Sequence, residues 1–242
     1  DQIGWGSPAW ATVSTLSQAE SFLDRVGPIV VKPLGLTGGK GVRVMGIQLE
    51  GREDVLDYIA ERIARDGQVL LEECLVGEEF SRMAFVSDGI LAPIPLMQDF
   101  KYAYDGDRGL MTGGMGAYSM AQGSLPFIEK DELKQADQLL RDVVHALEEM
   151  TGKSYRGFLY GQFMVTNSGI KLIEFNVRLG DPEALNLMAV LESDAQDVFH
   201  QISHGKLNPE TVNFLPRASV SKYLVPDAYP DPIEHPIPFT LE

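Results

Sequence analysis

The stretch FLYGQFMVTNSGIKLIEF, residues 158–175, contains two runs rich in aromatic and β-branched side chains, the composition that strands favour. Asn167, Ser168 and Gly169 separate the two runs, and residues of these types favour a tight turn. The stretch therefore predicts a β-hairpin with strands at 158–166 and 170–175.

The chain before this hairpin alternates predicted strands with predicted helices. Short apolar runs indicate strands at 29–32, 42–47, 69–71, near 80–86 and at 89–95. Apolar residues at helical spacing indicate helices at 17–26, 53–65 and 131–150. Ser17 with Glu20 forms a capping-box pattern, Asp131 is a candidate cap, and Pro182 is expected at the first position of a further helix. Hairpins beside helices favour an α+β fold on mainly antiparallel sheets.

Two further segments show no sustained periodicity. Residues 98–120 are rich in glycine and alanine, and the sequence predicts a long loop there, which in a compact domain is usually functional. Residues 206–242 are rich in proline, and we expect them to form a crossover or the stub of another domain.

Composition limits the classes of partner. The 242 residues carry a net charge of −15, which argues against a nucleic-acid or anionic-membrane surface. Cys74 is the single cysteine, so an intrachain disulfide is impossible and a reducing, cytoplasmic compartment is expected. No run of about 18 apolar residues predicts a membrane span, and the first residues do not resemble a signal peptide.

A lysine followed by a glycine-rich segment is the first candidate phosphate site. Lys32 ends a predicted strand, and GLTGGKG at 35–41 follows it. Glycines allow backbone N–H groups to approach phosphate oxygens closely. The spacing differs from that of a P-loop, because Gly41 follows Lys40. The alternative is a mobile turn with a solvated lysine.

An acidic segment follows the predicted strand at 69–71. The backbone of a strand end can pair with an adenine edge, and a nearby carboxylate can hold ribose hydroxyls. Glu72 and Glu73 stand at that strand end, with Glu79 a few residues on. The alternative is a solvated acidic turn. Cys74 is interpreted as a small apolar residue and not as a nucleophile.

The residues IEFNVR, 173–178, carry a candidate metal site. A period of two places Glu174, Asn176 and Arg178 on one face of a strand. Two hard oxygen donors with a guanidinium suit Mg²⁺ together with phosphate. Gln162, on the partner strand, could face the same site. The alternative is a half-exposed strand with ordinary surface residues.

An acidic residue near glycines suggests a small ammonium-binding pocket. Asp99 lies in QDFK at 98–101, and TGGMGAY follows at 112–118. The alternative is an irregular solvated loop. The four histidines show no metal-binding spacing; His200 and His204 are interpreted as ordinary helix residues.

Together these segments resemble the ATP-grasp superfamily, and within it the phosphoribosylamine–glycine ligases. The most specific stretches are QDFK at 98–101, GDRG at 106–109, TGGMGAY at 112–118 and EFNVRLGDPE at 174–183. The resemblance implies two α+β subdomains that clasp a nucleotide between antiparallel sheets. Residues 1–75 would form the lid with the glycine-rich loop, 76–205 the palm with the metal and glycine sites, and 206–242 the crossover or stub.

The resemblance also implies a role for each candidate residue. Lys32 would contact the α- and β-phosphates of ATP, and Lys40, beside Gly38 and Gly39, the β- and γ-phosphates. The nucleoside would meet Glu72, the backbone of Glu73 to Leu75, and Glu79. Mg²⁺ or Mn²⁺ would bind Glu174 and Asn176, with Gln162 where related enzymes often carry a carboxylate. Glycine would meet Asp99, Arg178, Gly180 and Asp181, and the residues implied in catalysis are Arg178, Lys40 and Asp99.

The implied reaction is ATP-dependent ligation of glycine to 5-phosphoribosylamine through glycyl phosphate, with small molecules as substrates and neither nucleic acid nor a membrane as a partner. Two alternatives stay open: an ATP-grasp ligase for another carboxylate or amine, and a nucleotide-binding module without catalysis. Phe100 stands where the family often has histidine, and Leu110-Met111 where it often has Pro-Asn, which leaves the choice of amino acid open. The oligomeric state also stays open.

Overall fold

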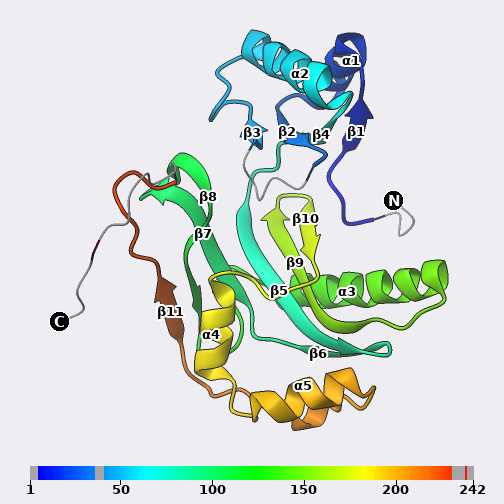
Figure 1. Ribbon diagram of the computed structural model, residues 1–242, viewed down its shortest axis with the longest axis vertical. Coiled ribbons are helices and arrows are strands. Elements are labelled where there is room, and N and C mark those ends of the chain that lie inside the picture. Colours follow the sequence, from blue (N-terminus) through cyan, green and yellow to red (C-terminus); the bar gives the residue numbers. More distant parts are fainter. Residues whose placement is uncertain (1–4, 36–40, 231–237, 239–242) are drawn as a thin grey trace. The chain divides into compact units, whose positions relative to one another are not determined.

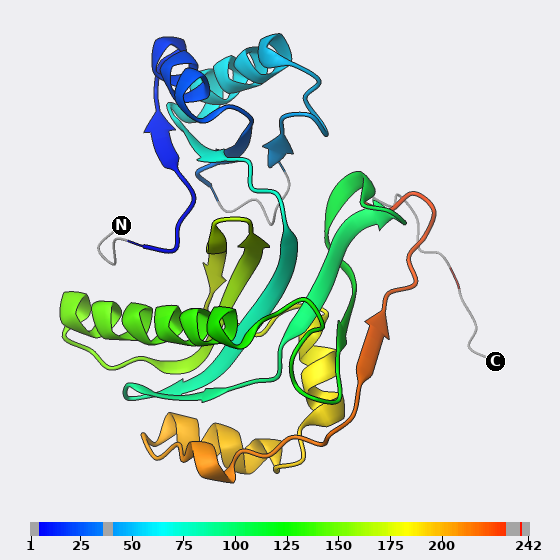
Figure 2. The same ribbon diagram turned by 180° about the vertical axis from the view of Figure 1, so that it is seen from behind.

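The computed structural model describes residues 5–35, 41–230 and 238. Its helices are α1 (Leu16–Val26), α2 (Arg52–Asp66), α3 (Lys130–Thr151), α4 (Glu183–Val190), α5 (Ala195–Ser203) and the short 3₁₀ helix η1 (Pro209–Thr211). Its strands are β1 (Trp10–Val13), β2 (Ile29–Pro33), β3 (Arg43–Val44), β4 (Val69–Glu73), β5 (Glu78–Ser87), β6 (Ile90–Pro93), β7 (Met97–Tyr104), β8 (Arg108–Ser119), β9 (Arg156–Thr166), β10 (Gly169–Asn176) and β11 (Ser219–Lys222). Figures 1 and 2 show these elements from opposite sides.

The strands form two sheets. The smaller has the order β1-β4-β2-β3, and the larger has the order β10-β9-β5-β7-β8-β11, with β6 paired to β5. All the strand pairings whose register is resolved are antiparallel. The α+β class expected from the sequence is therefore confirmed.

The chain divides into two compact units, each built from segments distant in sequence. Unit 1 comprises Asp1–Glu79, Phe127–Lys153 and Gly161–Phe175. Unit 2 comprises Phe80–Pro126, Ser154–Tyr160 and Asn176–Glu242. The domain boundaries expected from the resemblance, after residues 75 and 205, stay a prediction.

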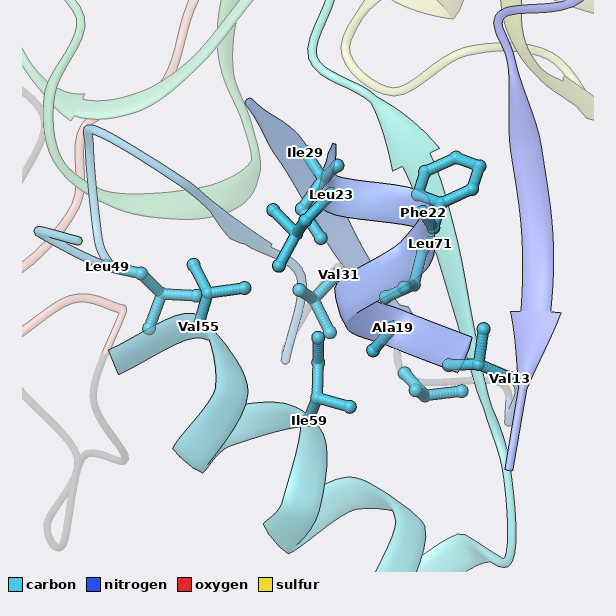
Figure 3. Packing of buried hydrophobic residues seen from close by; sticks show 11 residues of the cluster. Val13, Ala19, Phe22, Leu23, Ile29, Val31, Leu49, Val55, Ile59 and Leu71 are labelled. Carbon is cyan, nitrogen blue, oxygen red and sulfur yellow. The ribbon is translucent and has the colours of Figure 1, made fainter. Parts of the chain in front are cut away.

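Unit 1 contains the smaller sheet, with α1 and α2 on one of its faces (Figure 1). Apolar side chains from both helices and from β2 and β4 point into a single cluster (Figure 3). Ile29, Val31 and Leu71 are fully buried there, facing Val55 and Ile59 of α2. The alternation of buried and less buried residues along β2 and β4 explains this one-sided packing.

The helix α3 packs on β9 within the same unit. A Cβ built on Gly161 would lie 3.2 Å from the side chain of Leu140, so glycine permits the close approach of strand and helix. Trp5 extends this contact, because its Nε1 donates to Asp142 at 3.2 Å. The backbone N–H of Leu172 donates to the carbonyl of Gly6, which fixes the start of the described chain to β10.

Unit 2 is built around β5–β8, with α4 and α5 packed against them. Its core includes Met83, Phe85, Met97, Leu187 and Val198, all buried. Figure 2 shows α4 alongside β7, β8 and β11. This arrangement brings the segment that precedes α4 against the β7–β8 hairpin.

The strand β11 is anchored by a buried polar network. Asn186 of α4 is 1% exposed, and its Nδ2 donates to the carbonyl of Ala117 at 3.2 Å and to Ser219 Oγ at 3.1 Å. Ser221 Oγ donates to Asn186 Oδ1 at 2.7 Å, and the hydroxyls of Ser119 and Ser219 lie 2.7 Å apart. Part of the proline-rich segment therefore contributes a strand to the larger sheet.

Several sequence-based expectations need correction. The segment 98–120 is mostly the β7–β8 hairpin and not a loop. The strand expected at 42–47 is limited to Arg43–Val44. In α4, Pro182 is the N-cap and Glu183 is the first helical residue.

Helix caps also differ from the expected ones, while the helices themselves are confirmed. Thr15 caps α1 by accepting from the N–H of Gln18, so the box at Ser17 and Glu20 is wrong. Glu129 caps α3 in a reciprocal box with Glu132. Asp131 instead pairs with Lys134 at 2.8 Å.

In the part of the chain that the structure describes, no helix combines the length and apolarity needed to cross a membrane.

Candidate active site

The β7–β8 hairpin places two of the sequence motifs side by side. Asp99 is opposite Ala117 and Phe100 is opposite Gly116 in the antiparallel register. Tyr118 Oη donates to Gln98 Oε1 at 2.8 Å, and the rings of Phe100 and Tyr118 stack with centroids 6.2 Å apart. The motifs at 98–101 and 112–118 are thus paired strands of one hairpin, which the expectation of a long loop did not anticipate.

Asp99 is the buried acid of this hairpin. Its side chain is 3% exposed, and Lys101 Nζ lies 3.1 Å from its Oδ2. Lys101 is thus the cationic partner of Asp99 within the hairpin. The role of Asp99 as the partner of a substrate ammonium stays a prediction.

The segment before α4 lies directly against the hairpin. A Cβ built on Gly114 would lie 2.5 Å from the carbonyl oxygen of Asp181 and 2.9 Å from the ring of Pro182. The φ of Gly114 is +142°, which further restricts this position to glycine. Thr112 Oγ1 accepts from the N–H of Gly114 at 3.1 Å and donates to the carbonyl of Lys101 at 2.8 Å. The motif at 180–183 therefore joins the other two within unit 2.

Tyr223 fixes the same segment from the side of β11. Its hydroxyl donates a hydrogen bond to Asp181 Oδ1. That bond, together with burial and the negative charge of Asp181, raises the pKa of Tyr223 to about 12. Only the neutral phenol can donate, so the bond strengthens the folded state at every pH below the ordinary tyrosine range.

We expect Tyr223 to titrate later than an ordinary tyrosine. The difference in phenolate absorbance between the wild type and Y223F should show one group with a midpoint near pH 12 instead of 10. Because the pKa is raised in the folded state, the bond's contribution to the free energy of unfolding is complete below pH 10 and decreases as the pH rises towards 12. A difference titration centred near pH 10 would show that the bond to Asp181 is absent.

Two residues that were assigned no role from the sequence contact this segment. Tyr160 of β9 is 4% exposed and Glu183 of α4 is 1% exposed. Tyr160 Oη donates to Glu183 Oε1 at 3.0 Å, and the guanidinium of Arg178 lies over the Tyr160 ring, 5.8 Å from its centroid. Glu183 belongs to the GDPE motif and could have been selected from it, whereas Tyr160 carries no local signal in the sequence.

In unit 1 the candidate nucleotide residues are held by local contacts. Lys32 Nζ pairs with Glu72 Oε2 at 2.6 Å, and both side chains are largely buried. The N–H of Glu73 donates to the carbonyl of Ala9 at 2.8 Å, and Glu73 Oε2 accepts from the N–H of Ala9 at 3.2 Å. Lys32 thus has a fixed position at the end of its strand, in agreement with the sequence-based interpretation.

The end of β4 also contains the single cysteine. The N–H of Cys74 donates to the carbonyl of Pro28 at 2.9 Å, so it is already used within the unit. Burial raises the pKa of the Cys74 thiol, which opposes a nucleophilic role. Leu75 follows it with a half-buried side chain. Gly38, Gly39 and Lys40 lie outside the described residues.

The candidate metal residues come from β9 and β10. Glu174 and Asn176 alternate with apolar residues along β10, which directs both oxygen donors to one face of that strand. Gln162 is fully buried, and its Nε2 donates to Glu79 Oε2 at 3.0 Å. A carboxylate and two amides are hard oxygen donors and fit Mg²⁺ chemically. The hydrogen bond from Gln162 also connects this candidate metal site to Glu79, the carboxylate expected at the ribose.

Two of the four histidines contact each other. His200 and His204 stack with ring centroids 4.0 Å apart at the end of α5. Among the described residues, no group of three or more His, Cys, Asp or Glu side chains is arranged to hold a metal ion.

Two curated relatives that the chain matches share one name. The phosphoribosylamine–glycine ligase of Methanosarcina barkeri is 44% identical over 237 residues, which cover 98% of this chain and 54% of the relative. The enzyme of the same name from Methanoregula boonei is 47% identical over 226 residues, covering 93% and 52% of the two chains. The chain thus spans about half the length of the curated relatives it matches.

Solved structures agree with the fold. The crystal structure of phosphoribosylamine–glycine ligase from Thermotoga maritima superimposes with a TM-score of 0.79 at 29% identity, covering 95% of this chain and 57% of the other. N5-carboxyaminoimidazole synthetase from Staphylococcus aureus, in complex with ADP, gives a TM-score of 0.62 at 12% identity, covering 90% and 52% of the chains, and supports the fold alone. Residues 2–184 match the family described as phosphoribosylglycinamide synthetase, ATP-grasp (A) domain. The chain has the ATP-grasp fold and belongs to the phosphoribosylglycinamide synthetase family.

Proposed function

We propose that the chain forms the ATP-binding and amino-acid-activating part of a phosphoribosylamine–glycine ligase. One observation carries this proposal: three motifs distant in sequence, at 98–101, 112–118 and 180–183, pack against one another in unit 2. The first of these motifs carries the buried carboxylate of Asp99, which is a suitable partner for an ammonium group. Family membership supports the proposed reaction class, and the packing of the three motifs against one another supports a shared role for them.

The nucleotide residues follow the same proposal. Lys32 neutralises the α- and β-phosphates, and Lys40, with the backbone of Gly38 and Gly39, neutralises the transferred phosphoryl group. Adenine and ribose are met by Glu72, the segment Glu73 to Leu75, and Glu79. Glu174 and Asn176, with Gln162, hold Mg²⁺ or Mn²⁺, which when bound neutralises phosphate charge.

The chemistry has two steps. A carboxylate oxygen of glycine attacks the γ-phosphorus of ATP, ADP leaves, and glycyl phosphate forms. The amine of phosphoribosylamine then attacks the acyl carbon, phosphate leaves, and the nitrogen loses a proton as the amide forms. The protein contributes positioning and charge neutralisation. In this scheme Asp99 holds the ammonium group, and Arg178 faces the carboxylate or the phosphoryl group in transfer. Gly180 and Asp181 form the wall of the amino-acid site.

Calorimetric titration tests the proposal. Glycine is titrated into the chain in the presence of Mg²⁺ and a non-hydrolysable ATP analogue, with alanine, serine and aspartate in parallel. We expect glycine to bind selectively and only when the nucleotide is present. Binding of another amino acid in preference to glycine would favour a different ligase, and nucleotide binding without any amino acid would contradict the proposed activation step.

A further inference from the structure

One aromatic ring, that of Tyr160, contacts both ends of the segment 178–183. Its hydroxyl donates to Glu183 Oε1 at 3.0 Å, and its face lies below the guanidinium of Arg178 at 5.8 Å. The Arg178 guanidinium also donates to the carbonyl of Leu179 at 2.8 Å. A cation over a tyrosine face is attracted to it at this distance. The ring therefore links the position of the exposed arginine to that of the buried glutamate.

The carboxyl group of Glu183 supports the backbone of the same segment. A Cβ built on Gly180 would overlap Glu183 Oε2 and lie 2.5 Å from its Cδ. The N–H of Gly180 also contacts Met83 Sδ at 3.5 Å. The carboxyl group thus fills the space that a side chain at position 180 would need, and shortening Glu183 would leave the turn unsupported.

We propose that Tyr160 and Glu183 are a pair of positioning residues that fix the Arg178 guanidinium and the Gly180–Asp181 backbone at the amino-acid site. Neither residue is exposed enough to meet a substrate itself, since they are 4% and 1% exposed. They act through the segment that covers them. The assignment of that segment to amino-acid binding rests on the proposed function, but the contacts themselves do not.

The charge state of Glu183 determines which variants test this pair. Burial raises the pKa of Glu183, and so does the negative charge of Asp99, while the Tyr160 hydrogen bond and Lys101 oppose the rise. The Tyr223 hydroxyl also interacts electrostatically with the Glu183 carboxyl group. A carboxyl group with a raised pKa is neutral over a wider pH range, so glutamine is its nearest isosteric replacement. E183Q keeps an oxygen acceptor for Tyr160, whereas E183A removes it and leaves a cavity.

The experiment compares E183Q, E183A and Y160F with the wild type, and E192Q is the control because Glu192 is exposed. Two quantities are measured. The first is the Nε–Hε resonance of Arg178 in the free chain, assigned by its loss in R178K, which reports the ring below the guanidinium. The second is the Kd of glycine with Mg²⁺ and the ATP analogue, set against the Kd of the analogue alone.

We expect E183A to shift the Arg178 resonance and to weaken glycine binding at least about tenfold, with the Kd of the nucleotide analogue nearly unchanged. E183Q should keep both readouts within about threefold of the wild type, and Y160F should weaken glycine binding by about three- to tenfold. E192Q should change neither readout. A merely structural role would weaken glycine and nucleotide binding together and would not be rescued by glutamine.

The opposite results are equally distinct. The proposal would be overturned if E183A kept the Arg178 resonance and the glycine Kd of the wild type. It would also be overturned if E183Q weakened glycine binding as much as E183A does. If E183A does not fold, the Y160F variant provides the test. A Y160F variant with the glycine Kd of the wild type would overturn the proposal that Tyr160 and Glu183 position this segment. If the wild type binds no glycine but E183A still shifts the Arg178 resonance, the proposed function fails and the positioning role of the pair stands.

Discussion

Replacing Gly77 with alanine should destabilise unit 1 by more than about 3 kcal/mol, which is beyond the usual cost of overpacking. A Cβ at this position would overlap the carbonyl oxygen of Val165 and lie 2.8 Å from its carbonyl carbon. Both groups are backbone, so neither can move aside by changing a rotamer. The segment that connects β4 to β5 would therefore have to move away from the backbone of β9. Urea unfolding of the variant, followed by circular dichroism, measures the change in free energy.

Gly113 offers a matched control for this substitution. Nothing lies within 4 Å of a Cβ built there, and its φ is outside the left-handed region. G113A should therefore change the free energy of unfolding by less than about 1 kcal/mol, with stabilisation expected from the reduced freedom of the unfolded chain. An equal effect of G77A and G113A would contradict the close approach of the β4–β5 connection to Val165.

Replacing Glu174 with glutamine should remove most of the Mg²⁺ dependence of nucleotide binding. In the proposed function this carboxylate is the one charged metal ligand, and Gln162 and Asn176 supply neutral oxygens. The ratio of the nucleotide Kd without and with Mg²⁺ should fall by about ten- to a hundredfold in E174Q, the range known for groups that support a bound metal. Calorimetry of ADP binding with EDTA and with saturating Mg²⁺ measures this ratio.

The control is E149Q, which removes an equal charge from a residue outside the motifs. Glu149 lies on α3 with its side chain 69% exposed and 3.3 Å from His145. A surface pair of this kind is worth little, and the Mg²⁺ dependence should be unchanged. If E174Q retained the wild-type ratio, the metal would have to be held by other residues.

The sequence was most informative where a short motif carries its own geometry. Lys32 at a strand end and the alternation of Glu174 with Asn176 follow from local periodicity, and the structure has strands at both places. The expected position of Arg178 on the same strand is wrong, because β10 ends at Asn176. The helices at 53–65 and 131–150 follow from apolar spacing that tertiary packing reinforces. Helix caps were less predictable, because Thr15 and Ser17 both offer a suitable hydroxyl and only one begins the helix.

The β7–β8 hairpin shows why other parts could not be predicted. Its glycines depress strand propensity, and its register shifts between Phe100 and Tyr104 interrupt the period of two. Strand pairing there depends on packing against α4 and β11, which no local window contains. Tyr160 is missed for the same reason, since its partners lie 18 and 23 residues further along the chain.

The strand β11 comes late in the sequence, which affects the order in which unit 2 can fold during synthesis. Asn186 emerges before the serines at 219 and 221 that satisfy its amide, and β8 emerges earlier still, with the edge that β11 later covers. Domains generally fold as units during synthesis. Until β11 is made, the unpaired edge of β8 can form backbone hydrogen bonds with strands of other chains. Unit 2 therefore acquires its complete edge only after residue 222 has been translated. Asp99 is translated more than a hundred residues before β11, the last strand among the described residues, can pair with β8.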